Sequence, residues 1–260
     1  MQRLASSVTG NGPALLLIHG MGSASTAWKP LIPLLSNDFT VVTVDLPGHG
    51  KTPYIQGQGM DPHSLAIYAL HEMSELGFER FHIAGNSLGG WVALEVAATA
   101  PNRSASVTGL APAGLWLNPY NVRYPATALA RFLARYTAKF APTALHFEAA
   151  RRLGFADVSP RWREFDYQLC LDAVIAMAAA DGYYPAWDGM LMKRFDSEIP
   201  SEIPVTIIFG DSDRTLPATT CQERSVAPKH ARWIIFPDTG HAPMWDAPLD
   251  VADEIRKTTT

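Results

Sequence analysis

Short, unbroken apolar runs that alternate with helical patterns constrain the fold of this chain more than any other feature. Such runs occur at Ala14–Ile18, Thr40–Val44 and Phe81–Ala84, and a weaker one occurs at Val107–Leu110. A strand of a parallel sheet is buried on both faces, so it is continuously apolar rather than alternating. Strands that alternate with helices form right-handed βαβ units. These runs therefore predict neighbouring strands of one parallel sheet.

Helical patterns lie between these runs, and the strand pattern returns near the end of the chain. Apolar residues recur at three- and four-residue spacing from Leu65 to Leu76, and Leu88–Thr99 is apolar almost all round. Further strand runs occur at Val205–Phe209 and Trp233–Phe236, and a last helix is predicted over Leu249–Lys257. We therefore expect an α/β fold, with a mostly parallel sheet flanked by helices.

The segment from 116 to 200 has a different texture. It is rich in alanine, arginine and aromatic residues and has no strand pattern, which predicts three to five helices. A connection at the carboxyl edge of a parallel sheet passes over the crevice where ligands bind. We therefore expect a core domain made of residues 1–115 and 201–260, and a helical cap made of residues 116–200.

Composition excludes several other classes of protein. The 260 residues are 47% hydrophobic and 18% charged, which excludes a disordered chain. The formal net charge of −4 argues against binding nucleic acid without sequence preference, and against binding an anionic membrane surface. The first fifteen residues have no signal-peptide pattern, and apolar stretches such as Ala173–Ala180 are too short to span a bilayer. We expect a cytoplasmic protein.

The sequence gives no sign of a cofactor or a metal. Cys170 and Cys221 are too few for a disulfide framework, and no C-x-x-C motif is present. The chain also lacks the G-x-x-x-x-G-K pattern of phosphate-binding loops and a metal-ligand constellation. We therefore expect chemistry that amino-acid side chains perform alone.

The motif Gly85-Asn86-Ser87-Leu88-Gly89 is the strongest catalytic signal. It follows a predicted strand and precedes a predicted helix, which is the context that a G-x-S-x-G nucleophile turn requires. The turn is too tight for side chains two residues either side of the serine, so both positions are glycine. It would hold the Ser87 hydroxyl at a helix N-terminus, where backbone N–H groups stabilise a developing anion. Ser87 is the predicted nucleophile.

A serine hydroxyl needs a base, and the base needs an orienting carboxylate. His241 follows the last predicted strand in the sequence Asp238-Thr239-Gly240-His241, and Asp213 follows the preceding strand. Both positions lie at the carboxyl edge of the sheet, where ligand sites form. We predict His241 as the base and Asp213 as the acid. Asp211 is interpreted as a turn residue, Asp238 stays a weaker rival, and the remaining histidines are interpreted as solvated or structural.

The chain order Ser87, Asp213, His241 is typical of one hydrolase architecture, and two further turns extend the likeness. His19-Gly20-Met21-Gly22 follows the first strand, and the segment Asp45-Leu46-Pro47-Gly48-His49-Gly50 follows the second. With these motifs, and with Pro101-Asn102-Arg103 after the nucleophile helix, the sequence resembles the α/β-hydrolase superfamily over nearly all of the chain outside the insertion.

The resemblance implies an α/β-hydrolase fold with a helical cap and an oxyanion hole made by the backbone amides of Met21 and Leu88. It also implies that Asp45 and His49 fix a loop rather than act in catalysis. One departure concerns the N-terminus. Because few residues precede the first predicted strand, the antiparallel edge hairpin of the family is expected to be short or partly absent.

The superfamily contains many activities, so the fold does not choose the substrate. Serine rather than aspartate at position 87 argues against epoxide hydrolases and haloalkane dehalogenases. We expect a carboxylesterase that acts on small to medium acyl esters. The sequence around Ser87 also resembles C–C bond hydrolases of ring-cleavage products, although Ala242 after the histidine departs from them. A non-catalytic ligand-binding protein on the same fold is a third possibility.

Aromatic residues of the insertion are candidates for an apolar pocket wall. They cluster at Tyr183, Tyr184 and Trp187, with Leu115 and Trp116 at its start. The alternative is that these rings only pack the cap helices together. The predicted partner is a small-molecule ester, and the sequence leaves the oligomeric state open. Four arginines of the insertion are interpreted as a solvated helix surface: Arg151, Arg152, Arg161 and Arg163.

Overall fold

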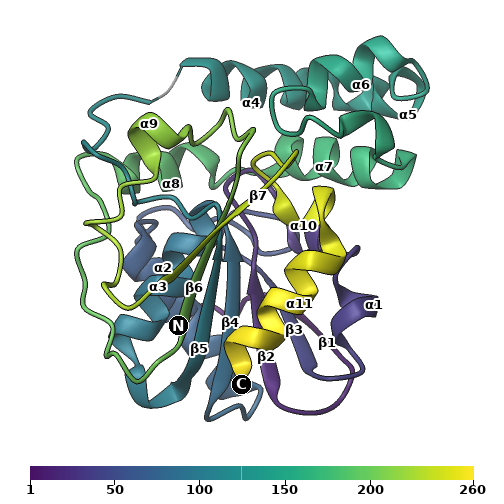
Figure 1. The fold of residues 1–260 in the computed structure, drawn as a ribbon. Helices are drawn as coiled ribbons and strands as arrows, with labels where there is room; N and C mark the ends of the chain where they lie inside the picture. Colours follow the sequence, from purple (N-terminus) through teal and green to yellow (C-terminus); the bar gives the residue numbers. More distant parts are fainter. Residues whose placement is uncertain (124) are drawn as a thin grey trace.

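A seven-stranded sheet in the order β1-β3-β2-β4-β5-β6-β7 forms the centre of the computed structural model, which describes residues 1–123 and 125–260 (Figure 1). Only β1 is antiparallel to its neighbour, so the predicted mostly parallel sheet is confirmed. The strands are β1 (Ala5–Thr9), β2 (Ala14–Ile18), β3 (Thr40–Asp45), β4 (Phe81–Asn86), β5 (Ser104–Leu110), β6 (Val205–Gly210) and β7 (Arg232–Phe236).

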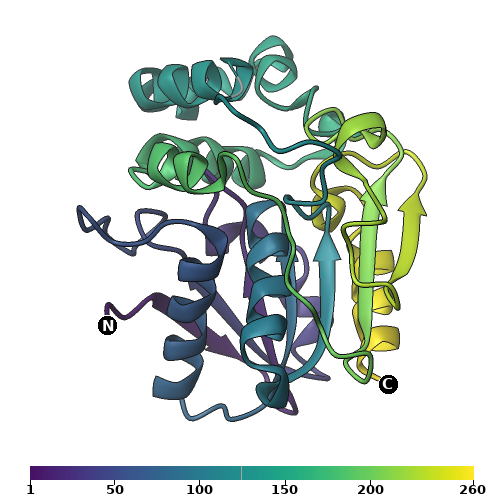
Figure 2. The same cartoon turned by 90° about the vertical axis from the view of Figure 1, so that its left-hand side faces the viewer.

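Burial on both faces explains why β2 reads as a continuous apolar run. Leu16 and Ile18 belong to the core on one side of the sheet, whereas Leu15 and Leu17 belong to the core on the other. Helices α2 (Pro62–Glu75) and α3 (Leu88–Thr99) cover the first face, and α1 (Ile32–Leu35), α10 (Pro243–Asp246) and α11 (Pro248–Thr259) cover the second (Figure 2). Alternate side chains therefore enter opposite cores.

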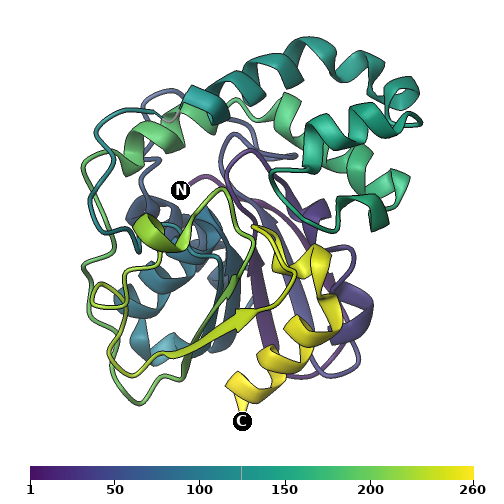
Figure 3. The same ribbon diagram turned by 45° about the horizontal axis from the view of Figure 1, so that its top comes forward.

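Helices make up the insertion, and no strand lies between β5 and β6 in the part of it that the structure describes. The helices are α4 (Pro125–Thr137), α5 (Ala141–Ala144), α6 (Glu148–Phe155), α7 (Tyr167–Ala179) and α8 (Tyr183–Met190). They lie above the carboxyl ends of the strands, with α4 to α6 outermost and α7 and α8 next to the sheet (Figures 1 and 3). The short helix α9 (Ala218–Cys221) follows β6.

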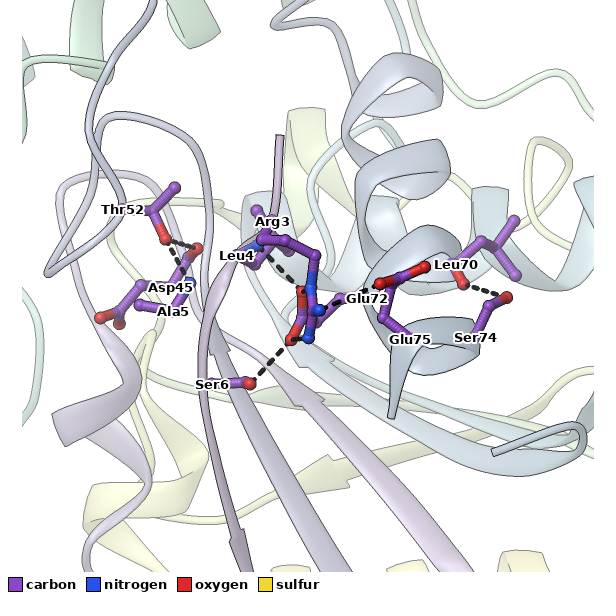
Figure 4. Close-up of polar contacts among 10 residues, drawn as sticks. All are labelled: Arg3, Leu4, Ala5, Ser6, Asp45, Thr52, Leu70, Glu72, Ser74 and Glu75. Atoms are coloured by element: carbon purple, nitrogen blue, oxygen red, sulfur yellow. Dashed lines mark hydrogen bonds and ion pairs between the residues drawn. The ribbon is translucent and has the colours of Figure 1, made fainter. Parts of the chain in front are cut away.

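The N-terminal edge has a single antiparallel strand, β1, which the sequence pattern did not reveal. Its residues are mostly exposed and polar, so they have no apolar periodicity to detect. The Glu72 carboxylate of α2 fastens this edge, because it accepts hydrogen bonds from Arg3 Nε at 2.7 Å, from the Leu4 N–H at 3.0 Å and from Ser6 Oγ at 2.8 Å (Figure 4). Burial alone would raise the pKa of Glu72, but these donors lower it.

In the described part of the chain, no helix has both the length and the hydropathy needed to cross a bilayer.

Candidate active site

Ser87 lies in the sharp turn between β4 and α3. Its φ of 55° places a non-glycine residue in the left-handed region, where strain is characteristic of functional positions. The flanking glycines are required by close approach. A Cβ added to Gly85 would lie 2.0 Å from the Gly89 carbonyl oxygen, and one added to Gly89 would lie 2.1 Å from the Ile18 oxygen. The turn therefore accepts no side chain at either position.

His241 and Asp213 form a direct pair at the carboxyl edge of the sheet. Nδ1 of His241 lies 2.9 Å from Oδ2 of Asp213, whose side chain is fully buried. Oδ1 of Asp213 accepts the backbone N–H groups of Thr215 at 2.9 Å and Leu216 at 2.8 Å. A carboxylate that accepts these bonds holds the proton of His241 on Nδ1, which leaves Nε2 as the basic nitrogen.

The rival residues have other contacts. Oδ1 of Asp211 accepts a hydrogen bond from Ser212 Oγ at 2.9 Å, and the N–H of Asp211 donates to the Phe236 oxygen at 3.0 Å, which is the turn role expected of it. Nδ1 of His82 lies 2.8 Å from Ser106 Oγ within the sheet. His230 lies 3.0 Å from the Ile203 oxygen.

Asn86 joins the nucleophile turn to the histidine loop. Its side-chain amide donates to the backbone oxygen of His241 and to that of Leu110, each at 3.0 Å. Because Asn86 immediately precedes Ser87, these bonds fix the two loops relative to each other. No local pattern in the sequence assigns this role to Asn86, since its partner lies 155 positions away.

The two amides predicted for the oxyanion hole lie beside this turn. A Cβ added to Gly20 would lie 3.1 Å from the Cβ of Ser87, so the loop that carries Met21 lies against Ser87. Leu88 is the first residue of α3, where a backbone N–H has no partner within the helix. Among the described residues neither N–H has a hydrogen-bond acceptor. Both amides are therefore available to an anion.

The turn after β3 is held by buried side chains rather than by exposed catalytic ones. Asp45 accepts the N–H groups of Ser25 at 2.7 Å and Lys51 at 2.9 Å. His19 Nε2 accepts the Leu46 N–H at 3.0 Å, which fixes a neutral ring. Burial, with the adjacent His19 ring adding to it, lowers the pKa of His49 to about 3. These contacts agree with the loop-fixing role expected of Asp45 and His49.

One segment of the insertion, Val158-Ser159, is hydrogen-bonded to the histidine loop, Gly240-His241, directly and through Asp246. The N–H of His241 donates to the Val158 oxygen at 2.8 Å. The buried carboxylate of Asp246 accepts the Gly240 N–H at 2.7 Å on one oxygen and the Ser159 hydroxyl on the other. Burial raises the pKa of Asp246 despite these donors. The backbone N–H of His241 is thus bonded to the insertion, and that of Gly240 before it is bonded to α10.

The predicted pocket residues separate into two groups. Tyr183 lies over the loop that carries Met21, since a Cβ on Gly22 would lie 3.0 Å from its ring and 2.7 Å from Sδ of Met177. Trp116 instead packs edge-on against Trp91, with ring centroids 5.3 Å apart.

The remaining pocket candidates lie among core or surface contacts. Trp187 packs on Tyr120 at 5.7 Å, and Leu115 is fully buried in the main core. The Tyr184 ring lies 4.7 Å below the Arg123 guanidinium. Sequence reasoning missed Met177, which carries no motif.

Neither cysteine pairs with the other, and both are buried. Burial raises the pKa of the Cys170 thiol to about 11, so this thiol stays protonated at neutral pH. No cluster of three or more His, Cys, Asp or Glu side chains suited to a metal occurs among the residues that the structure describes.

With this geometry established, comparison with known proteins assigns the family. The sequence profile of the Alpha/beta hydrolase family matches residues 15–254, which is most of the chain. The chain belongs to this family. The match includes the turns at Ser87, Asp213 and His241, and it confirms the fold that the motifs predicted.

Known proteins resemble this alpha/beta hydrolase in sequence or in fold. An uncharacterized protein of Mycobacterium tuberculosis is 30% identical over 99% of this chain and 79% of its own length. The pimeloyl-[acyl-carrier protein] methyl ester esterase of Aeromonas hydrophila is 27% identical over 92% of each chain. A solved meta-cleavage product hydrolase of Pseudomonas fluorescens has a TM-score of 0.72 at 18% identity, covering 98% of this chain and 93% of that one. This last likeness concerns the fold alone.

Proposed function

We propose that this hydrolase cleaves carboxylic esters of small to medium acyl chain through an acyl-enzyme intermediate. Ser87 is the nucleophile, His241 the general base, and Asp213 the carboxylate that orients the imidazole. The observation that carries the proposal is the 2.9 Å contact between His241 Nδ1 and Asp213 Oδ2, in a chain whose nucleophile turn holds Ser87 in a strained conformation. The methyl ester esterase of Aeromonas hydrophila, which is 27% identical to this chain, supports the same chemistry.

The proposed reaction has two halves. Oγ of Ser87 attacks the acyl carbon while Nε2 of His241 takes its proton, and the amides of Met21 and Leu88 hold the negative carbonyl oxygen. The tetrahedral species then expels the alcohol, which leaves with the proton from His241. A water molecule attacks the acyl-serine in the same way, giving its proton to His241, and the acid is released as Ser87 regains a proton.

Residues 116–200 are proposed as a cap whose inner helices bound the acyl site. Met177 of α7 and Tyr183 of α8 lie against the loop that carries Met21, so they are the pocket residues that this structure favours. Trp187 packs on Tyr120 instead, which favours a packing role over a place in the pocket wall. Excluding water from the crevice would strengthen the interaction between the amides and the oxyanion.

The test is turnover of p-nitrophenyl esters graded by chain length, with a dienoic ring-cleavage ketone in the same panel. Ser87→Ala should lower kcat by about 10⁴- to 10⁶-fold, because the attacking oxygen is removed. Ser7→Ala, an exposed serine on β1, is the matched control and should keep wild-type rates. Ester turnover unaffected by Ser87→Ala would overturn the proposal. Turnover of the ketone alone would assign a C–C bond hydrolase, and turnover of neither substrate class would favour a binding protein.

A further inference from the structure

Helix α4 exposes its large apolar side chains and buries an arginine, which is the reverse of an ordinary amphipathic helix. Arg131 faces the protein, where its Nε donates to the Ala180 oxygen at 3.0 Å and its side chain is almost fully buried. The large apolar side chains of the helix and of the turn after it point outward instead. These are Leu129, Phe132, Leu133, Tyr136 and Phe140, which are 47–61% exposed.

The outward residues form one continuous stripe. They recur at three- and four-residue spacing, so they lie on the same side of the helix. The rings of Phe132 and Tyr136 contact each other with centroids 4.9 Å apart. Phe147 and Leu153, in and just before α6, are also exposed at 65% and 88%. Contiguous apolar surface of this kind marks a site of interaction rather than ordinary solvent contact.

The charge around the stripe is strongly one-sided. No Asp or Glu occurs from residue 96 to residue 147, although the whole chain has 25 of them. Over residues 125–155, which form α4 to α6, Glu148 is the single acidic residue, and four basic residues stand against it besides the buried Arg131. One of the four, Arg135, lies 3.6 Å from Asp181. The Lys139 ammonium lies 4.9 Å over the Phe140 ring at one end of the stripe. The outer layer is therefore positive in a chain whose net charge is −4.

We propose that the outer face of α4 and α6 docks on an anionic lipid surface. A helix with Leu and Phe on one side and an excess of basic charge around them inserts its apolar side at the boundary between headgroups and acyl chains. Each Lys or Arg near an anionic bilayer adds attraction. A second copy of this chain fits less well, since it would bring two positive faces together. The net charge of −4 argues against membrane binding only as an average, because the charge is not spread evenly over the surface.

The position of the stripe suits this role. Helices α4 to α6 form the outermost layer of the molecule, away from the sheet, and α7 and α8 support them from below (Figure 2). The face can therefore meet a flat surface without displacing the rest of the fold. The inference concerns binding alone and does not depend on the proposed esterase activity.

The experiment is co-sedimentation of the full chain with vesicles of phosphatidylcholine, or of phosphatidylcholine with about one third phosphatidylglycerol. The wild-type chain should sediment with the mixed vesicles and far less with neutral ones. Replacing Phe132 and Tyr136 together by Ser, or Lys139→Glu alone, should weaken binding at least about tenfold. Leu249→Ser is the matched control, because Leu249 is an exposed leucine on α11 and should not matter.

Three outcomes would overturn the proposal. The first is wild-type protein that sediments with neither kind of vesicle, or equally with both. The second is a Phe132/Tyr136 double variant that binds the mixed vesicles as the wild type does. The third comes from light scattering in solution. A wild-type dimer that the double variant converts to a monomer would show that the face binds a second copy. Circular dichroism checks that each variant keeps the helix content of the wild-type chain, and Lys139→Glu tests the face without removing an apolar side chain.

Discussion

Asp211 and Asp213 stand two positions apart after β6, yet their carboxylates have different partners. Asp213 contacts His241, whereas Asp211 accepts from Ser212 within its own turn. We predict that Asp213→Asn lowers kcat by about 10⁴-fold, since an amide no longer holds the imidazole in the required tautomer. Asp211→Asn should change mainly stability, by about 1 kcal/mol. Steady-state kinetics and urea unfolding of both variants decide, and the reverse order of the two kcat values would move the acid to Asp211.

His49 gives a prediction about pH. Its pKa is lowered from 6.5 to about 3 in the folded chain, so between these two pH values the unfolded chain binds a proton at His49 and the folded chain does not. Its contribution to stability is complete above about pH 6.5 and is lost as the pH falls toward 3, at about 1.4 kcal/mol per pH unit. His49→Gln should therefore make the free energy of unfolding less dependent on pH between about pH 6 and pH 4. Equal slopes in urea titrations of the two proteins would contradict this assignment.

How much of the site could be predicted differs from residue to residue. Ser87 and its glycines were identifiable because the tight turn leaves a local pattern, and the structure shows the close approaches that require it. His241 and Asp213 were found from their place after strands, and the structure brings these two together. Asn86 and Met177 could not be found, because their partners come from remote elements that no spacing reveals.

At the scale of elements, the contact between the insertion and the histidine loop gives the next prediction. Asp246 of α10 bonds to both Ser159 and Gly240. Asp246→Ala leaves these buried donors without acceptors, which should cost about 1–3 kcal/mol in unfolding free energy. It should also lower kcat more than it changes KM, because the loop that holds His241 loses an anchor. Asp250→Ala, an exposed aspartate at the start of α11, is the matched control.

A loss of stability in Asp246→Ala with kcat intact would reduce this residue to a packing role. Ser159→Ala removes only the bond from the insertion, so it should reproduce the smaller part of the kcat loss. Asp246→Asn keeps an acceptor oxygen. Compared with Asp246→Ala, it should recover a larger share of the lost kcat than of the lost unfolding free energy.

Elements were predictable where burial imposes a pattern. The strands buried on both faces appear as apolar runs, and β2 is found with the bounds predicted for it. Strand β1 was not predicted, because its exposed side chains are free of that constraint and it pairs with β3, which lies further along the chain. The orientation of α4 also escaped prediction, since a periodic apolar stripe predicts a buried face and here the stripe points outward.

For the molecule as a whole, Glu72 links the N-terminal edge of the sheet to the helical layer. Glu72→Ala leaves the Leu4 N–H and the Ser6 hydroxyl without an acceptor and the Arg3 guanidinium without its main partner. We predict a loss of about 2–3 kcal/mol in the free energy of unfolding. Glu75→Ala breaks a single exposed contact with Arg3 and should cost less than about 0.5 kcal/mol. Similar losses in the two variants, measured by urea unfolding, would show that the edge is fastened elsewhere.

The contact between Asn86 and His241 spans 155 positions, which has a consequence for the chain while it is being made. Synthesis runs from the N-terminus, so the Ser87 turn and the strands that flank it are made long before residue 241. The imidazole arrives only once residue 241 has left the ribosome. Until then, Ser87 lacks the imidazole that we propose as its base. On the proposed mechanism, Ser87 gains its base only after the loop that follows β7 has packed against Asn86.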